Sequence, residues 1–383
     1  GGVKTVATDP VSTFSMDVDT AAYSNVRRLL QQGATPPVAA VRIEELVNYF
    51  RYDHPRPSAG EGFALRTELA PSPGHPDRHL LMIGLAAEAP AARTDRPRNL
   101  VLLVDTSGSM QAPDKLPLLQ RALRMLVTRL GPEDRISIVA YAGRAGVVLE
   151  PTPGDEQLRI AGALDALTAG GSTHGSAGLA RAYALARQHF MAGGVNRVFL
   201  ATDGDFNVGT SDPQALERLV RRERASGIGL TVLGFGRGNY DDATAQALAQ
   251  HGDGIAAYID GLGEARRVLV DQLDAQLHTV AREARIQVEF NPARVAEYRL
   301  VGYETRAMAR EDFEDDAADA GDVGAGHQVT ALYEIALVGS GGERVRPLRY
   351  GSTGTAAIER GDELAHVRVR WLAPRDDARA TGG

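Results

Sequence analysis

Residues 101–110 read VLLVDTSGSM, an apolar run that gives way at once to polar residues. The run Val101–Val104 is typical of a strand buried on both faces of a sheet. Three oxygen-bearing side chains follow it at alternating positions, namely Asp105, Ser107 and Ser109. Such a cluster indicates a binding site, because ligands of open parallel sheets bind outside the carboxyl ends of the strands.

Outward from this stretch, short apolar runs alternate with amphipathic ones from about residue 99 to residue 280. The runs NLVLLVD, RISIVAYAG, NRVFLATDG and GLTVLGFG predict strands. The helix expected after the first strand carries apolar residues at helical spacing, which are Leu116, Leu119, Leu123, Val127 and Leu130. This alternation predicts an α/β fold with a doubly wound, mostly parallel sheet covered by helices on both faces. Apolar spacing predicts a last helix over about residues 262–282.

The segments on either side of this region have a different pattern. RIQVEF and HVRVRW, after residue 284, alternate with period two, which is typical of half-exposed antiparallel strands. FALRTEL and HLLMIGLA, before residue 99, also predict strands, and TAAYSNVRRLLQQG and VRIEELVNYF predict helices. We therefore expect a helical N-terminal segment over residues 1–60 and a discontinuous antiparallel β domain over residues 61–95 and 284–372. The α/β domain, residues 96–282, is inserted into the β domain.

Composition limits the partners that the chain can have. The 383 residues, 43% of them hydrophobic, are enough for more than one domain with a buried core. A net charge of -7 argues against nucleic acid or an anionic membrane as a partner, because both bind basic surfaces. The absence of cysteine excludes disulfides and thiolate metal sites. Among 42 basic residues only Lys4 and Lys115 are lysines, which indicates genome composition rather than function.

No apolar run in the sequence is long enough to span a membrane. Because the sequence begins with Gly1, we expect a removed signal peptide or a lipid-anchor segment upstream.

Three polar loops are expected to meet at the carboxyl edge of the parallel sheet. The first holds Asp105, the second is AGGSTHGSAG at residues 169–178, and the third is TDG, which contains Asp203. They supply carboxylates and hydroxyls, the ligands that hard cations such as Mg²⁺, Mn²⁺ and Ca²⁺ prefer. The alternative is that the aspartate and serines only cap a helix.

The combined pattern resembles the metal-ion-dependent adhesion site of von Willebrand factor type A domains. It consists of D-x-S-x-S at Asp105, Ser107 and Ser109, Thr173 in a later glycine-rich loop, and T-D-G around Asp203. The resemblance implies that the three hydroxyls contact the cation and that the two aspartates help directly or through water. The implied cation is Mg²⁺, with Mn²⁺ or Ca²⁺ as alternatives.

The flanking segments resemble those of bacterial YfbK-type envelope proteins, which are often lipoproteins. The stretches that carry this resemblance are FSMDVDTAAYSNVRRLLQQG, VRIEELVNYFRYD and YETRAMAREDF. It implies a location in the cell envelope. We expect a non-enzymatic adhesion or assembly module that coordinates an Asp or Glu carboxylate of a partner protein through its cation. The alternatives are an assembly subunit whose cation only stabilises loops, and a Mg²⁺-dependent hydrolase.

Other polar groups favour ordinary structural roles. His174, Asp205 and Asn207 are interpreted as loop residues, and the glycines of GFGRGNYDD predict a turn. An acidic run lacks the spacing of a calcium loop and predicts a solvated loop; it consists of Asp312, Asp315, Asp316, Asp319 and Asp322. The sequence contains no H-E-x-x-H, G-x-S-x-G or Walker A motif.

Overall fold

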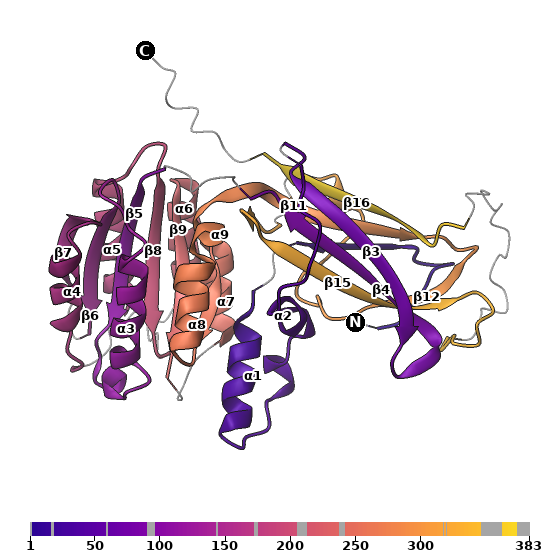
Figure 1. The fold of residues 1–383 in the computed structure, drawn as a ribbon, viewed down its shortest axis with the longest axis horizontal. Helices are drawn as coiled ribbons and strands as arrows, with labels where there is room; N and C mark the ends of the chain where they lie inside the picture. Colours follow the sequence, from indigo (N-terminus) through magenta and orange to yellow (C-terminus); the bar gives the residue numbers. More distant parts are fainter. Residues whose placement is uncertain are drawn as a thin grey trace, which may run out of the picture. The chain divides into compact units, whose positions relative to one another are not determined.

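The computed structural model describes residues 2–16, 19–58, 60–89, 96–142, 145–171, 175–204, 213–236, 242–316, 318, 320–345 and 362–373 (Figure 1). The chain divides into two compact units. The β unit consists of Gly1–Val18, Arg42–Ala89 and Thr279–Pro374, and the α/β unit contains Asp19–Val41 and Pro90–His278.

The α/β unit is built on a six-stranded sheet with the order β10-β9-β8-β5-β6-β7. Its strands are β5 (Arg98–Asp105), β6 (Arg135–Tyr141), β7 (Ala145–Pro153), β8 (Val195–Thr202), β9 (Ile228–Phe235) and β10 (Ala256–Ile259). Neighbouring strands run parallel except β7, which is antiparallel to β6. The chain passes from β5 to β6 on one side and later returns to β8 on the other, so that β5 lies at a topological switch point.

Helices cover both faces of this sheet. They are α3 (Leu116–Val127), α4 (Gln157–Asp165), α5 (Gly175–Gln188), α6 (Pro213–Ala225), α7 (Asp242–His251), α8 (Leu262–Arg266) and α9 (Leu273–Leu277). Helix α1 (Ala21–Gln31) contacts the edge strand β10, and η1 (Val38–Ala40) and η2 (Gly108–Gln111) are short 3₁₀ turns of the same unit. Leu100 and Leu102 of β5 share one apolar cluster with α3, α4 and α8, whereas Val101 and Leu103 share another with α5, α6 and α7. Successive side chains of one strand therefore enter opposite cores, which confirms the predicted doubly wound α/β fold.

The last helical region differs from its prediction. Instead of one helix over residues 262–282, α8 is followed by a π-helical turn, Arg267–Asp271, and then by the short α9. Residues from Thr279 onward are already a strand. Nowhere in the described part of the chain is there a helix that is both long enough and apolar enough to cross a membrane.

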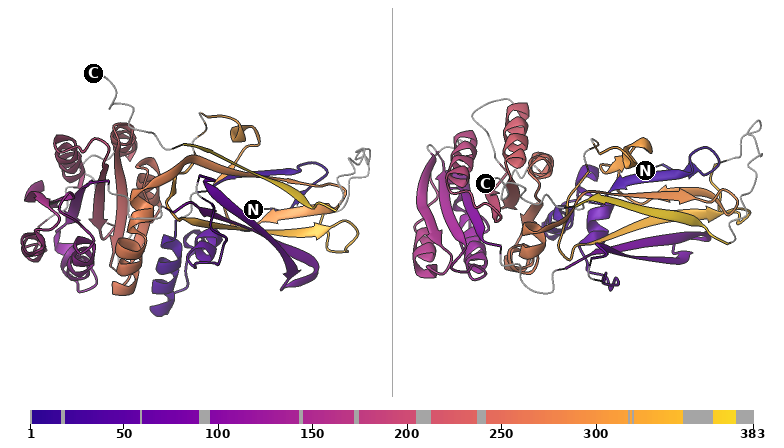
Figure 2. Two further views of the ribbon diagram at one scale, coloured as in Figure 1. Left: turned by 45° about the horizontal axis from the view of Figure 1, so that its top comes forward. Right: turned by 90° about the horizontal axis from the view of Figure 1, so that it is seen from above.

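The β unit contains two sheets that enclose one apolar cluster (Figure 2). The first has the order β1-β12-β15-β4-β3, and the second has the order β13-β2-β11-β14 with β16 also paired to β11. The elements are β1 (Lys4–Thr5), β2 (Val11–Ser15), α2 (Ile43–Asn48), β3 (Phe63–Ser72), β4 (His75–Ala87), β11 (Thr279–Phe290), β12 (Val295–Leu300), β13 (Ala307–Met308), η4 (Glu311–Phe313), β14 (Val323–Gly324), β15 (Gln328–Leu337) and β16 (Ala365–Leu372).

The segment expected to be helical over residues 1–60 is instead divided between the two units. Strand β2 pairs antiparallel with β11, Phe14 lying opposite Ile286, and so belongs to the β unit. Helix α1 belongs to the α/β unit, where both carboxylate oxygens of Asp260 accept hydrogen bonds of 2.7 Å from Arg27. The prediction was wrong at β2 because a five-residue strand has too few positions to show its period, and its partner lies far along the chain.

The two strands with period-two patterns, β11 and β16, pair antiparallel, with Val288 opposite Val367. Strand β16 is half-exposed, as predicted. Most of β11 is buried, because β2 and β16 flank it and the apolar cluster packs against it.

The acidic run is a surface loop, as predicted, with the side chains of Asp315 and Asp316 exposed, but its backbone is also held by a buried residue. The guanidinium of Arg285 donates hydrogen bonds to the backbone carbonyl oxygens of Asp312, Asp315 (2.7 Å) and Ala318 (3.0 Å). Arg285 itself is buried. The backbone of the loop is therefore folded around the guanidinium of Arg285. Asp319 lies outside the described residues.

Candidate metal centre

The two aspartates of the predicted site lie at the same edge of the α/β sheet. Asp105 is the last residue of β5, and Asp203 directly follows β8. These strands are parallel neighbours, with Val104 opposite Ala201, so both carboxylates are at the carboxyl ends of adjacent strands. Both side chains are buried. The backbone conformation explains why T-D-G ends in glycine. Gly204 has a φ of 99°, which residues with a side chain rarely adopt.

Asp105 has one satisfied and one unsatisfied carboxylate oxygen. Oδ1 accepts a hydrogen bond of 2.8 Å from the backbone N–H of Ser107. Oδ2 is buried and has no hydrogen-bond partner within the described part of the chain. Burial raises the pKa of the Asp105 carboxyl, and the charge of Asp203 adds to the rise. A buried carboxylate oxygen without a partner is costly, so this position favours a cation.

The two serine hydroxyls lie side by side next to Asp105. Ser107 Oγ is 2.9 Å from Ser109 Oγ. Ser107 precedes η2, but its side chain makes no capping hydrogen bond, so the helix-cap alternative does not describe this serine. The D-x-S-x-S spacing therefore brings two neutral oxygens together beside the buried carboxylate.

The second predicted loop, residues 169–178, approaches the same turn. The backbone N–H of Gly108 donates to the carbonyl of Gly171 (3.0 Å), and that of Gly170 donates to the carbonyl of Thr106 (2.8 Å). Thr173 itself lies outside the described residues, as do His174, Asp205 and Asn207. The residues just before Thr173 are thus tied to the D-x-S-x-S turn.

One residue at this site was missed by the sequence analysis. Lys115, just before α3, donates a hydrogen bond of 2.7 Å from Nζ to Asp203 Oδ2. The rarity of lysine could have pointed to Lys115. The chain uses arginine almost everywhere else, and this lysine follows shortly after D-x-S-x-S.

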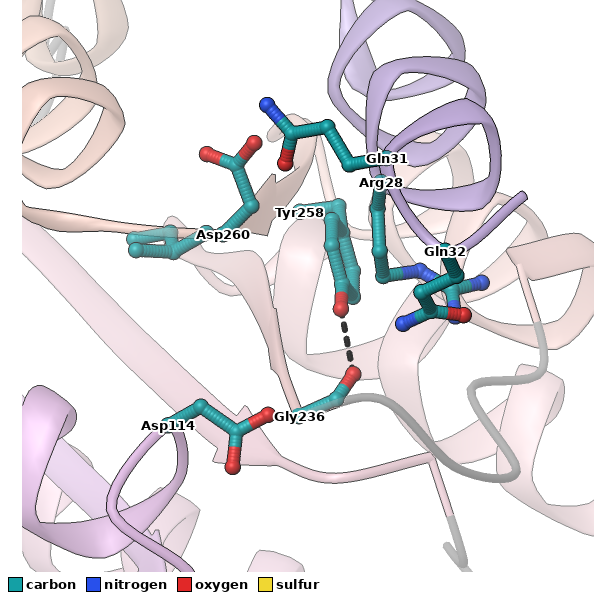
Figure 3. A pocket seen from close by; sticks show the side chains of 8 residues that line it. Arg28, Gln31, Gln32, Asp114, Gly236, Tyr258 and Asp260 are labelled. Atoms are coloured by element: carbon teal, nitrogen blue, oxygen red, sulfur yellow. Dashed lines mark hydrogen bonds between the residues drawn. The ribbon is translucent and has the colours of Figure 1, made fainter. Parts of the chain in front are cut away.

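A polar pocket of about 410 Å³, part of it open to solvent, lies within the α/β unit (Figure 3). Its lining consists of Arg28, Gln31, Gln32, Asp114, Gly236, Tyr258, Ile259 and Asp260. The Arg28 guanidinium carbon lies 5.3 Å from the centroid of the Tyr258 ring, and the Tyr258 hydroxyl donates to the carbonyl of Gly236. Gly236 connects the pocket to the site, because a Cβ atom at this position would collide with the side chain of Lys115.

The donor set fits a hard divalent cation. Among the described residues there is no group of three or more histidine, aspartate and glutamate side chains that could hold a metal ion. A cation here would depend on the two serine hydroxyls and the unsatisfied Asp105 oxygen, all of which are oxygen ligands. Softer metals that prefer sulfur or several imidazoles do not match this set.

Comparison with known proteins agrees with this architecture. The family described as "von Willebrand factor type A domain" matches residues 100–205, the family described as "von Willebrand factor" matches residues 1–82, and "Uncharacterized protein YfbK, C-terminal" matches residues 275–381. The protein YfbK of Escherichia coli is 44% identical over 381 residues, which cover 97% of this chain and 66% of that protein. The protein sll0103 of Synechocystis is 31% identical over 217 residues, 55% of this chain and 49% of that protein.

Among solved structures, a von Willebrand factor type A protein from Catenulispora acidiphila has a TM-score of 0.48 at 17% identity, covering 85% of this chain and 72% of that one.

The fold and the matching family define the class, which is that of proteins with a von Willebrand factor type A domain. Within that class the chain belongs to the YfbK family, to whose Escherichia coli member it is similar along almost all of its own length. The chain spans 66% of the length of that relative.

Proposed function

We propose that the chain is a non-enzymatic, metal-dependent protein-binding module of the bacterial cell envelope. It binds an Asp or Glu carboxylate of a partner protein through a divalent cation, Mg²⁺ first among the candidates. The location in the envelope rests on the resemblance of the flanking segments to YfbK-type envelope proteins.

The observation that carries this proposal is the unsatisfied Oδ2 of the buried Asp105 beside the paired hydroxyls of Ser107 and Ser109. Asp105, Ser107, Ser109, Thr173 and Asp203 are the residues that would hold the cation. A bound divalent cation supplies an electrophilic centre for an anionic oxygen of the partner. The serines contribute no charge, so they leave more of the cation's charge for that partner oxygen than carboxylates would.

A purely structural cation has less support. The turn that holds Ser107 and Ser109 is already joined to the second loop, residues 169–178, by two backbone hydrogen bonds, from Gly108 to Gly171 and from Gly170 to Thr106. These loops have a connection of their own, so holding them together does not require an ion.

We expect the double substitution Ser107→Ala and Ser109→Ala to abolish cation binding. Loss of outer-shell partners typically costs a metal site roughly 10–100-fold in affinity, and loss of two direct ligands should cost more than that. Calorimetric titration with Mg²⁺ or Mn²⁺ measures the effect, with Ser226→Ala, an exposed serine of the same unit, as the control. An unchanged affinity in the double variant would refute the site.

Asp105→Asn should separate stability from function. The substitution removes a buried negative charge whose Oδ2 is unsatisfied. The free energy of unfolding of the metal-free protein should therefore rise by about 1 kcal/mol, a size typical of substitutions that stabilise a protein at the expense of its function. The same variant should lose cation binding. Thermal unfolding in the presence of a chelator and of Mg²⁺ tests both effects. A metal-free protein that melts lower than the wild type would contradict this account of Asp105.

A further inference from the structure

Lys115 places a positive charge inside the candidate metal centre. Its Nζ lies 2.7 Å from Asp203 Oδ2, and the two side chains are only 14% and 3% exposed. An ion pair this well shielded from solvent acts more strongly on its surroundings than a surface pair. One of the two aspartates of the site therefore already has a cationic partner.

The backbone at Gly236 holds the lysine in this position. A Cβ atom at Gly236 would lie 2.6 Å from Lys115 Cγ and 2.9 Å from Cδ, so a side chain at position 236 would force the lysine stem to shift. Gly236 has a φ of 84°, which also favours glycine. The Tyr258 hydroxyl donates to the Gly236 carbonyl, which fixes this piece of backbone after β9 (Figure 3). The stem of Lys115 thus lies against the backbone at Gly236 and is largely shielded from solvent.

A fixed ammonium has opposite effects on the two species that the site would bind. It repels a divalent cation, and it cancels part of the attraction of Asp203 for that cation. It attracts a carboxylate that approaches the same place. Lysine suits this role because its charge is compact, whereas the guanidinium of arginine is wide and planar.

We propose that Lys115 is a specificity-determining counter-charge that weakens cation binding and strengthens carboxylate binding at this site. The inference rests on the proposed function. Because coupling between two bound species is reciprocal, the cation is held most firmly when the partner's carboxylate is also bound. With Lys115 present, the site binds the cation weakly when no carboxylate is bound and strongly when the partner's carboxylate is bound.

The test is a pair of calorimetric titrations on the full chain, first with Mg²⁺ alone and then with acetate in saturating Mg²⁺. Lys115→Met should bind Mg²⁺ about tenfold more tightly and acetate about tenfold more weakly than the wild type, because a nearby buried positive charge repels a cation and attracts an anion. Lys4→Met removes the only other lysine, which is 49% exposed and paired with Asp9 in the β unit, and should change neither affinity.

A second variant keeps the charge and moves it. Gly236→Ala should push the lysine stem away from Asp203 and give the same two shifts at smaller size. If the wild type binds Mg²⁺ and acetate and Lys115→Met changes neither affinity, the role of Lys115 is overturned but the proposed function is not. A wild type that binds no Mg²⁺ overturns the proposed function instead. Loss of both affinities in a folded Lys115→Met protein would make Lys115 a supporting residue and overturn the inference.

Discussion

Replacing Arg78 by methionine should lower the free energy of unfolding of the β unit by about 3–5 kcal/mol, the usual cost of removing one partner from a buried ion pair. Arg78 is buried in β4 and lies between two buried glutamates. Its Nη1 is 3.3 Å from Glu297 Oε2, and its Nε is 3.6 Å from Glu334 Oε2. Nη1 also donates to the carbonyl of Gly342 (2.6 Å). Methionine would fill much of the space but leave both carboxylates without this cation.

The measurement is urea denaturation followed by the fluorescence of Trp371, the single tryptophan, which lies in β16 of the same unit. Arg66→Met is the matched control, because Arg66 is 46% exposed and pairs with Glu68 on the surface. Exposed pairs of this kind contribute about 0–1 kcal/mol. Equal losses in the two variants would mean that burial of the Arg78 pair has no special effect.

Phe14→Ala should cost a similar amount, about 3–5 kcal/mol, because it removes a fully buried aromatic side chain and leaves a cavity. The Phe14 ring lies 4.8 Å from that of Tyr303 and 6.4 Å from that of Tyr333, measured between centroids. The same Trp371 signal reports the loss. Phe50→Ala, at a ring that is 52% exposed, should cost about 0.5 kcal/mol or less. A Phe14 variant as stable as the wild type would show that β2 is not required by the β unit.

The part of the fold that sequence patterns predicted well is the α/β unit. Strands such as β5 and β8 are continuous apolar runs, and α3 shows its apolar residues at helical spacing, so the signal is local. The position of Asp105 and Asp203 followed from the same patterns, since a residue that ends a parallel strand must lie at the carboxyl edge of the sheet.

The features that the sequence did not predict depend on contacts between distant residues. Strand β2 is recognised only through its pairing with β11, which starts beyond residue 278. The hydrogen bonds from Arg285 to the backbone of the acidic loop were not predicted, because Arg285 lies in β11, about 30 residues before the loop. The contacts of Lys115 could not be predicted either, because they form only where the ends of β8 and β9 bring Asp203 and Gly236 to it.

The pairing of β2 with β11 also bears on how the protein is made. Strands from the first 90 residues pair with strands that lie beyond residue 278, as β1 does with β12 and β4 with β15. At about 5–20 residues per second, a ribosome needs roughly 10–40 s to make the intervening stretch. During that interval the early strands have left the ribosome without their partners, while the strands of the α/β sheet are being completed. Among the described strands, these N-terminal ones therefore wait longest with unpaired edges and most need protection from aggregation.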